Sequence, residues 1–426
     1  MTPIVARAVY IKAEARDDPR SMARIERMLP FVRCQRPPEI VDDEALHQVV
    51  IDNRLNTLPR HGMRGDDIQP VVIFNQFLYH HGPERRAARR RRYPELFTTW
   101  HGVYGGYNGW DWRPSGDAEY RRTTGLVCQP AYAMHSVWGC PFRCAYCELG
   151  HVANIYVNLE DWVAHIRQGL GNLANSPRQR LFQWDNGTDA VCWEPEYGGA
   201  KMLIELFADQ TDKYLELYVG KSDNVDVMLD CDHRGHTVCC WSLSTEAQCR
   251  LAEGGTADME ARLASARTCL QAGYTVRIRL SPMVPLVGWA EDIRHMIARM
   301  FDEITPDLVT VEPLRFCTHE MLLRDFPADS MDPAFMQAMA TMPADADDWT
   351  TSQFPDACRI RMYRVVLDEI ARRRPRTPVA FCREKRRVWD VLARDMNRMG
   401  QSPDDYVCNC GPFSAGPDRR LQAAGT

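Results

Sequence analysis

The chain has 426 residues, of which 45% are hydrophobic and 26% are charged, a composition typical of a globular protein that buries a core. Its formal net charge of -5 gives no general attraction to phosphate backbones, so nucleic-acid binding would need a local basic patch. No apolar run is long enough to cross a bilayer, and Arg7 interrupts the segment where a signal peptide would be apolar, so we expect a cytoplasmic protein without membrane contact.

Residues 1–122 are predicted to form a small α/β extension. Six arginines lie between Arg85 and Arg92, and such a run can bind the phosphates of DNA or of a nucleotide. We favour a solvated helix face or loop, because most charge runs of this length are exposed to water. The other expected elements of this region are strands at 8–11 and 71–77 and a helix at 19–30.

Residues 123–316 repeat the order strand, loop, helix. A stripe of apolar residues from 257 to 271 indicates a helix that ends near Gly273. This alternation predicts a parallel sheet or an open barrel, in which the chemistry gathers at the carboxyl ends of the strands. The expected buried strands are 181–184, 215–219, 238–243, 276–280 and 308–311.

Residues 317–413 are expected to be helical and charged, and they contain Cys382, Cys408 and Cys410. These three cysteines are consistent with an auxiliary iron–sulfur cluster, for which Cys317 is a candidate fourth ligand unless the site stays open for a substrate. The alternatives are a structural zinc site or unrelated thiols, because this spacing is not a signature. The segment 414–426 is rich in Gly, Pro and Ala and is expected to be disordered.

The strongest chemical signal is a C-x3-C-x2-C loop formed by Cys140, Cys144 and Cys147. Three thiolates on one loop can bind three irons of a [4Fe–4S] cluster, and the fourth iron can then chelate S-adenosylmethionine (SAM). Reductive cleavage of SAM yields a 5'-deoxyadenosyl radical that abstracts hydrogen from unreactive carbon. The alternatives are a zinc site completed by a distant residue such as His151, or plain buried cysteines, but zinc sites more often use paired C-x2-C spacings.

The loop and its context resemble the radical SAM superfamily and, within it, the spore photoproduct lyase group. The resemblance implies an α/β fold: a partial (β/α)6 barrel over 123–316 with the cluster at its mouth, an N-terminal α/β extension, and a helical, cysteine-containing C-terminal extension. It extends from the N-terminal strand to about Phe316. The segments that carry it are IVARAVYIKAEARDDP, CQPAYAMHSVWGCPFRCAYC, TDAVCWEP, LDCDHRGHTVCCWSLSTE and ARTCLQAGYTVRIRLSPM.

Five SAM contacts follow from the resemblance. Tyr146, directly before the third cysteine, is expected near the adenine. Lys221 can meet the SAM carboxylate, while the hydroxyls of Thr188 and Ser242 can bind the carboxylate or the ribose. Glu194 is expected to receive the SAM amino group, as acidic residues do in many members of the superfamily.

Two departures from the lyase pattern bear on the substrate. The lyase returns a hydrogen atom to its product through a cysteine and a tyrosine, and the matching positions here carry Asn186 and Glu148. Neither side chain gives up a hydrogen atom readily, which argues against thymine-dimer repair. His135, Asn186 and Glu148 are therefore treated as candidate substrate contacts only.

We accordingly expect a radical SAM enzyme that receives its electron from a donor such as flavodoxin or ferredoxin. Its expected substrate is a small nucleoside-like or nucleotide-like molecule rather than a nucleic acid. The expected reaction is a biosynthetic tailoring step, with sulfur insertion if the second cluster exists. The alternatives are repair of a DNA lesion, as in spore photoproduct lyase, and a non-catalytic metal-binding or redox-sensing protein.

Overall fold

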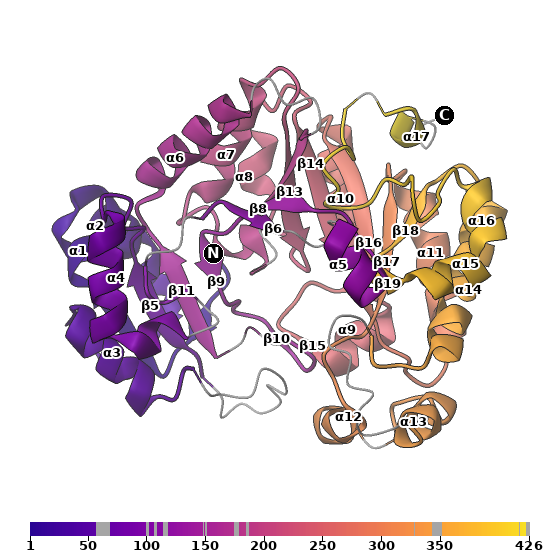
Figure 1. The fold of residues 1–426 in the computed structure, drawn as a ribbon, viewed down its shortest axis with the longest axis horizontal. Helices are drawn as coiled ribbons and strands as arrows, with labels where there is room; N and C mark the ends of the chain where they lie inside the picture. The colour runs from indigo at the N-terminus through magenta and orange to yellow at the C-terminus, as the bar shows by residue number, and fades with distance from the viewer. Residues whose placement is uncertain are drawn as a thin grey trace.

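The computed structural model describes residues 1–56, 69–98, 102–105, 109–113, 118–147, 149, 151–173, 179–184, 187–327, 329–342, 352–416 and 418–422. Two larger sheets organise these residues (Figure 1). Within the described residues no helix is long and apolar enough to span a membrane.

The first sheet has five strands and forms the core of the N-terminal layer. Its strand pairs are parallel except for the pair of β9 with β11. In spatial order the strands are β4 (Glu39–Val41), β2 (Ala8–Lys12), β5 (Val71–Asn75), β11 (Val152–Tyr156) and β9 (Val137–Trp138). The helices of this layer are α1 (Ala13–Asp17), α2 (Pro19–Met28), α3 (Asp43–Asp52) and α4 (Pro83–Arg92).

The second sheet has eight strands and curls into a half-barrel, which confirms the predicted partial α/β barrel (Figure 1). All neighbouring strands are parallel except the outermost pair, β6 with β8. In spatial order the strands are β18 (Val379–Phe381), β17 (Val309–Pro313), β16 (Thr275–Met283), β14 (Thr237–Ser242), β13 (Tyr214–Gly220), β12 (Leu181–Trp184), β8 (Ala131–Met134) and β6 (Asp111–Arg113).

Helices cover the outer face of the half-barrel, and smaller elements close its ends (Figure 1). The outer helices are α6 (Leu159–Asn172), α7 (Gly199–Ala208), α8 (Asp226–Leu229), α10 (Met259–Gln271), α11 (Trp289–Glu303) and α14 (Asp356–Arg373). The remaining helices are α5 (Ala118–Thr124), α9 (Glu246–Ala252), α12 (His319–Asp325), α13 (Pro333–Ala340), α15 (Arg386–Val391), α16 (Ala393–Arg398) and α17 (Arg419–Gln422). The short paired strands are β1 (Ile4–Val5) with β3 (Val32–Arg33), β10 (Arg143–Cys144) with β15 (Glu253–Gly254), and β19 (Glu384–Lys385) with β7 (Leu126–Val127).

The barrel strands alternate in polarity along their length. In β16, Val276 and Ile278 belong to the hydrophobic core, whereas Arg277 and Arg279 point to the opposite face and bond to polar groups inside the half-barrel. Successive strand residues face opposite sides, so one face packs against helices while the other lines a polar interior. This interior is where a partial barrel can hold charged groups.

The expected domain limits do not coincide with the sheets. β9 and β11 lie within 123–316 in sequence but pair in the N-terminal sheet, and β6 and β18 lie outside that range but complete the barrel sheet. Strand pairing between distant segments is set by tertiary contacts, which local pattern does not encode. The expected disorder of 414–426 is also wrong for the described residues there, since α17 is formed and Leu421 is buried.

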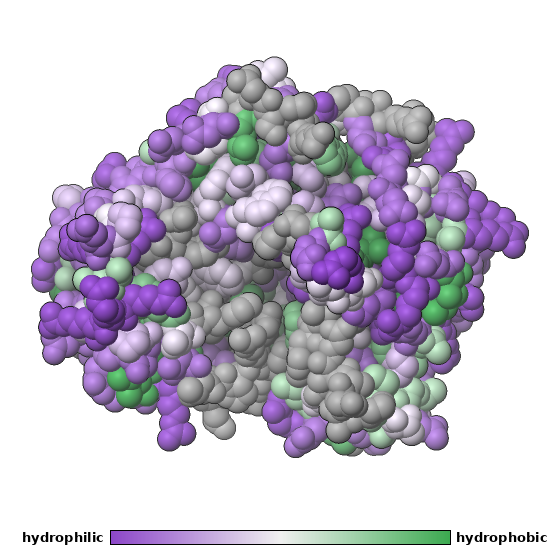
Figure 2. Space-filling view, in the orientation of Figure 1, coloured by the Kyte–Doolittle hydropathy of each residue, from purple (hydrophilic) through white to green (hydrophobic). Residues whose placement is uncertain are grey.

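The Arg-rich run is a helix, α4, as expected for a solvated charged face. Arg89 is the exception, because its buried guanidinium forms an ion pair with Asp43. Figure 2 shows strongly hydrophilic side chains over this part of the N-terminal layer.

Candidate active site

Cys140, Cys144 and Cys147 lie on the loop that leaves β9 and returns to β11. The loop is tied to the barrel because β10 pairs with β15, where Cys144 lies opposite Glu253. Its first turn depends on Gly139, whose φ is +103° and whose hypothetical Cβ would lie 1.8 Å from the Val152 carbonyl oxygen. Backbone contacts therefore anchor the loop at Gly139 and at Cys144.

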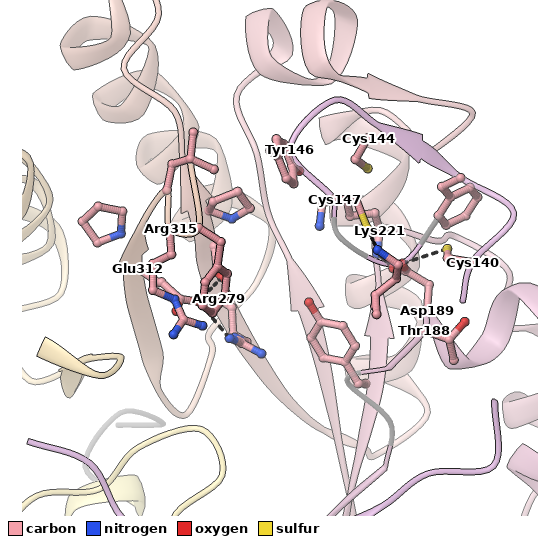
Figure 3. A pocket seen from close by; sticks show the side chains of 18 residues that line it. Cys140, Cys144, Tyr146, Cys147, Thr188, Asp189, Lys221, Arg279, Glu312 and Arg315 are labelled. Carbon is pink, nitrogen blue, oxygen red and sulfur yellow. Dashed lines mark hydrogen bonds and ion pairs between the residues drawn. The ribbon is translucent and has the colours of Figure 1, made fainter. Parts of the chain in front are cut away.

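The three cysteines border a cavity of about 250 Å³ at the carboxyl ends of the barrel strands. Figure 3 shows two groups of side chains that line it. The cysteine loop lies on one side with Tyr146, Thr188, Asp189 and Lys221, and on the other side lie Arg279, Glu312 and Arg315.

Tyr146 and Lys221 share a buried anion, Glu253. The Tyr146 hydroxyl donates to Glu253 Oε1, and Lys221 Nζ lies 5.7 Å from the centre of the Tyr146 ring. Arg262 Nη2 forms an ion pair with Glu253 at 2.5 Å, with both side chains fully buried. Burial raises the pKa of Glu253, but the charges of Arg262 and Lys221 and the hydrogen bond from Tyr146 lower it to about 2. Glu253 is therefore ionised, and it holds the Tyr146 side chain, which the resemblance places near the adenine of SAM.

Asp189 connects the cysteine loop to β13. Its Oδ1 accepts the backbone N–H of Lys221, and its Oδ2 lies 3.4 Å from Cys140 Sγ. The contact requires glycine at position 220, where φ is +72° and a Cβ would lie 1.7 Å from Asp189 Oδ1. Thr188, the preceding residue, is buried at the cavity and accepts a 2.8 Å hydrogen bond from Trp193 Nε1.

The opposite side of the cavity carries two arginines and one carboxylate. Arg279 Nη2 lies 3.2 Å from Glu312 Oε2, and Arg315 pairs with the same carboxylate. Burial raises the pKa of Glu312, but the charges of Arg315 and Arg279 lower it overall. Buried nitrogens of both arginines, Nε of Arg279 and Nη1 of Arg315, have no hydrogen-bond partner among the described residues. This side therefore has a net positive charge and can bind an anionic or carbonyl-bearing ligand.

The structure brings three of the five expected SAM contacts, Tyr146, Thr188 and Lys221, to the cavity. It places the other two elsewhere. Glu194 accepts 2.8 Å hydrogen bonds from the backbone of Gly198 and Ala200 at the start of α7. Ser242 is buried beneath the cavity, and its Oγ pairs at 2.5 Å with the hydroxyl of Tyr218, a cavity residue.

The candidate substrate contacts from the sequence do not line the cavity in the described residues. His135 is buried directly after β8 and contacts Trp138 with tilted rings whose centres are 4.6 Å apart. Asn186 and Glu148 lie outside the described residues. The sequence also missed Asp189, Glu253, Arg279, Glu312 and Arg315. The alternation of charged and apolar residues in 276–280 was the available signal for the inward-facing Arg279.

The donor set fits a three-cysteine iron–sulfur cluster. Three thiols of one loop border a cavity, and the buried Lys221 lies close enough to offset the negative charge of thiolates. Burial raises the pKa of both Cys140 and Cys144, so their thiols are protonated here and would lose protons as metal binds. No group of three His, Cys, Asp or Glu side chains in the described ranges is already at metal-ligand distance, so this loop would close on its metal.

Comparisons with known proteins agree on one family. The family profile "Spore photoproduct lyase" matches residues 127–323. Curated spore photoproduct lyases are similar: that of Geobacillus sp. (strain Y412MC61) is 28% identical over 190 residues, covering 42% of this chain and 55% of the relative. That of Clostridium acetobutylicum is 24% identical over 213 residues, covering 47% and 62%. The chain thus spans between half and two thirds of the length of these relatives.

Solved structures extend the likeness of fold to most of the chain. A spore photoproduct lyase mutant with dinucleoside spore photoproduct superposes with a TM-score of 0.61 at 18% identity, covering 89% of this chain and 100% of that one. Another mutant, with bound AdoMet and dinucleoside spore photoproduct, gives a TM-score of 0.60 at 17% identity, covering 89% and 99%. The matched segment, the cysteine motif and the shared fold make this chain similar to the spore photoproduct lyases, a radical SAM group, over residues 127–323.

Proposed function

We propose that this chain cleaves SAM reductively and that the resulting radical abstracts a hydrogen atom from a dinucleoside lesion of the spore photoproduct kind in DNA, giving 5'-deoxyadenosine and a lesion radical. The observation that carries the proposal is the cavity, which has the cluster loop on one side and Arg279 and Arg315 on the other. The names of the relatives support the substrate class, because they are spore photoproduct lyases, two of them solved with dinucleoside spore photoproduct.

This proposal corrects two expectations from the sequence. The family profile and the curated relatives are all spore photoproduct lyases, which contradicts a biosynthetic tailoring step with sulfur insertion. The lyase structures with dinucleoside spore photoproduct also contradict the expectation that nucleic acid is not a partner. The acidic net charge did not predict a nucleic-acid substrate, because it is a sum over the whole chain. A lesion in the cavity would contact only local charges, such as those of Arg279 and Arg315.

The roles of the side chains follow from their places around the cavity. When bound at a cluster on Cys140, Cys144 and Cys147, SAM supplies a 5'-deoxyadenosyl radical after one electron arrives from a donor such as flavodoxin or ferredoxin. Lys221 and Thr188 bind polar groups of SAM, and Glu253 holds Tyr146 for the adenine.

Two further groups act on the lesion. The unpaired guanidinium nitrogens of Arg279 and Arg315 donate to the phosphodiester or the base carbonyls. The Tyr218 hydroxyl, held by Ser242, lies at the same cavity and could donate a hydrogen bond to a polar group of the lesion.

The test is an anaerobic reaction of reconstituted protein with SAM, a reductant and synthetic dinucleoside spore photoproduct. We expect 5'-deoxyadenosine to form and the lesion to be consumed, both lost in Cys144→Ala and kept in Cys34→Ala, a cysteine on the N-terminal layer. Formation of 5'-deoxyadenosine without loss of the lesion would reject the substrate class. Absence of both products would reject SAM cleavage and favour the non-catalytic metal-binding or redox-sensing alternative.

A further inference from the structure

A second group of cysteines converges inside the half-barrel from three distant segments. Cys382 follows β18, and its backbone N–H donates to the Val311 carbonyl at 2.9 Å. Cys128 follows β7, which pairs antiparallel with β19 so that Val127 lies opposite Glu384. Extending this register places Cys128 opposite residue 383, beside Cys382.

The third segment is the loop 408–414, which brings Cys408 and Cys410 to the same place. Gln129, next to Cys128, donates from Nε2 to the Tyr406 carbonyl at 2.7 Å, and its Oε1 lies 3.6 Å from Cys408 Sγ. The fit is tight, because a Cβ on Gly411 would lie 1.9 Å from Gln129 Oε1 and 3.0 Å from Cys408 Sγ.

The loop is fixed to the polar interior of the barrel. Arg277 donates to the carbonyls of Asn409 and Ser414, both at 2.9 Å. The side chain of Asn409 bonds to Glu216 and to Cys240 Sγ, so it turns away from its two cysteine neighbours. Buried carbonyls and a buried arginine that satisfy one another hold this loop in one position.

A cation faces the cysteines. Arg113 Nη2 lies 2.7 Å from Cys410 Sγ, and the buried Nε of Arg113 has no hydrogen-bond partner among the described residues. An arginine is therefore present to offset the negative charge of a thiolate at Cys410.

Cys317, the fourth ligand expected from the sequence, is not part of this group. Its backbone N–H donates to Gln353 at 3.2 Å, and its pKa is raised by burial and by Asp325. Cys128, in contrast, precedes Gln129, whose Oε1 lies 3.6 Å from Cys408 Sγ.

We infer that Cys128, Cys382, Cys408 and Cys410 hold a second iron–sulfur cluster inside the barrel, separate from the one at Cys140, Cys144 and Cys147. Four thiolates are the usual ligand set of such clusters, and like the first set these thiols would close on their metal. A structural zinc site on the same four thiols is the alternative, and metal analysis distinguishes the two.

The experiment uses the full chain with Cys140, Cys144 and Cys147 replaced by Ala, reconstituted anaerobically with iron and sulfide. We expect about four irons and four sulfides per chain and an electron paramagnetic resonance signal on reduction. Adding Cys128→Ser or Cys410→Ser should abolish both, whereas adding Cys317→Ser should leave both unchanged. Circular dichroism of each variant checks that the fold is kept.

A second arm keeps the first cluster in place. In the otherwise unaltered chain, Cys410→Ser should lower iron from about eight to about four per chain while SAM cleavage is retained. Iron unaffected by Cys128→Ser and Cys410→Ser, iron lost on Cys317→Ser, or zinc bound in place of iron would overturn the inference. These readouts are metal content and spectra, so they stand apart from the outcome of the lesion assay.

Discussion

Glu253 organises the inner side of the cavity at the scale of single residues. It is fully buried and contacts Tyr146, Arg262 and two uncharged donors, Ser244 and Gln248. An ion pair in this position is sensitive to the loss of one partner, because the other charge then stays buried and unpaired.

Replacing Glu253 with Gln should lower the free energy of unfolding by about 3 kcal/mol, because Arg262 loses its buried counter-charge. Denaturant titration measures the effect. The matched control is Glu260→Gln, whose exposed carboxylate pairs with Arg299 and should contribute less than about 1 kcal/mol. An equal fall in the free energy of unfolding in the two variants would show that the buried ion pair stabilises the fold no more than the exposed one.

The same carboxylate predicts a pH dependence. Its pKa is about 2 in the folded protein against an ordinary value of 4.5, so its stabilising effect is complete above pH 4.5 and is lost as the pH falls toward 2. Unfolding measured over this range should show a steeper loss of stability in the natural chain than in Glu253→Gln. If the stability of both proteins falls equally as the pH is lowered, Glu253 does not have the low pKa that is expected of it.

Lys221 is the cation of the cluster side of the cavity. Replacing it with Ala should weaken SAM binding by about tenfold to a hundredfold, the range for losing a charged hydrogen-bond partner. Equilibrium dialysis of SAM with the reconstituted protein measures this. Lys201→Ala is the control, since Lys201 is exposed on α7 and pairs only with Glu205. A Lys221→Ala protein that binds SAM normally would remove Lys221 from the site.

At the scale of elements, the cysteine loop depends on two strands of different sheets. β9 delivers Cys140 through Gly139, and the pair of β10 with β15 positions Cys144 next to the barrel. These backbone contacts anchor the loop at Gly139 and at Cys144, and the three thiols would then close on the metal.

Gly139→Ala should therefore disturb the cluster loop more than an ordinary glycine substitution. Its new Cβ would meet the Val152 carbonyl, whereas Gly288, also at positive φ, has no atom within 4 Å of the equivalent position. Gly288→Ala should cost only about 1 kcal/mol for its backbone conformation. Gly139→Ala should cost more and should also lower the iron bound by Cys140, Cys144 and Cys147. Thermal unfolding and iron analysis of the two variants test this.

At the scale of the whole molecule, two charge distributions oppose the acidic net charge. One is inside, where Arg279 and Arg315 line the cavity. The other is outside, where α4 carries exposed arginines over the N-terminal layer (Figure 2). A protein that handles a lesion in DNA needs such local patches, because phosphate contacts supply most of the affinity that does not depend on sequence.

Replacing Arg85, Arg90 and Arg91 with Gln should weaken binding to double-stranded DNA and reduce its dependence on salt. Fluorescence anisotropy at several salt concentrations measures both. The matched control replaces Arg372, Arg373 and Arg374, exposed at the end of α14. If the two variants bind alike, α4 is a solvated face only and DNA meets the protein elsewhere.

The sequence by itself determined the parts of this protein that are local in the chain. The spacing of Cys140, Cys144 and Cys147 predicted a cluster loop, because the three cysteines lie within eight residues, and the structure has all three bordering the cavity. The strand–helix alternation predicted the barrel, because periodicity reports which side of an element is buried. The placement of Tyr146 and Lys221 at the cavity followed from the family motif rather than from periodicity.

Only the tertiary structure decided which distant residues meet. Glu253 faces Tyr146 because β15 pairs with β10, and Arg279 lines the cavity because alternate residues of β16 point into the barrel. Cys128 comes near Cys382 through the pairing of β7 with β19, two strands that are distant in the sequence. Strand register and side-chain direction come from long-range packing, and that information is spread over the whole chain rather than held in a motif.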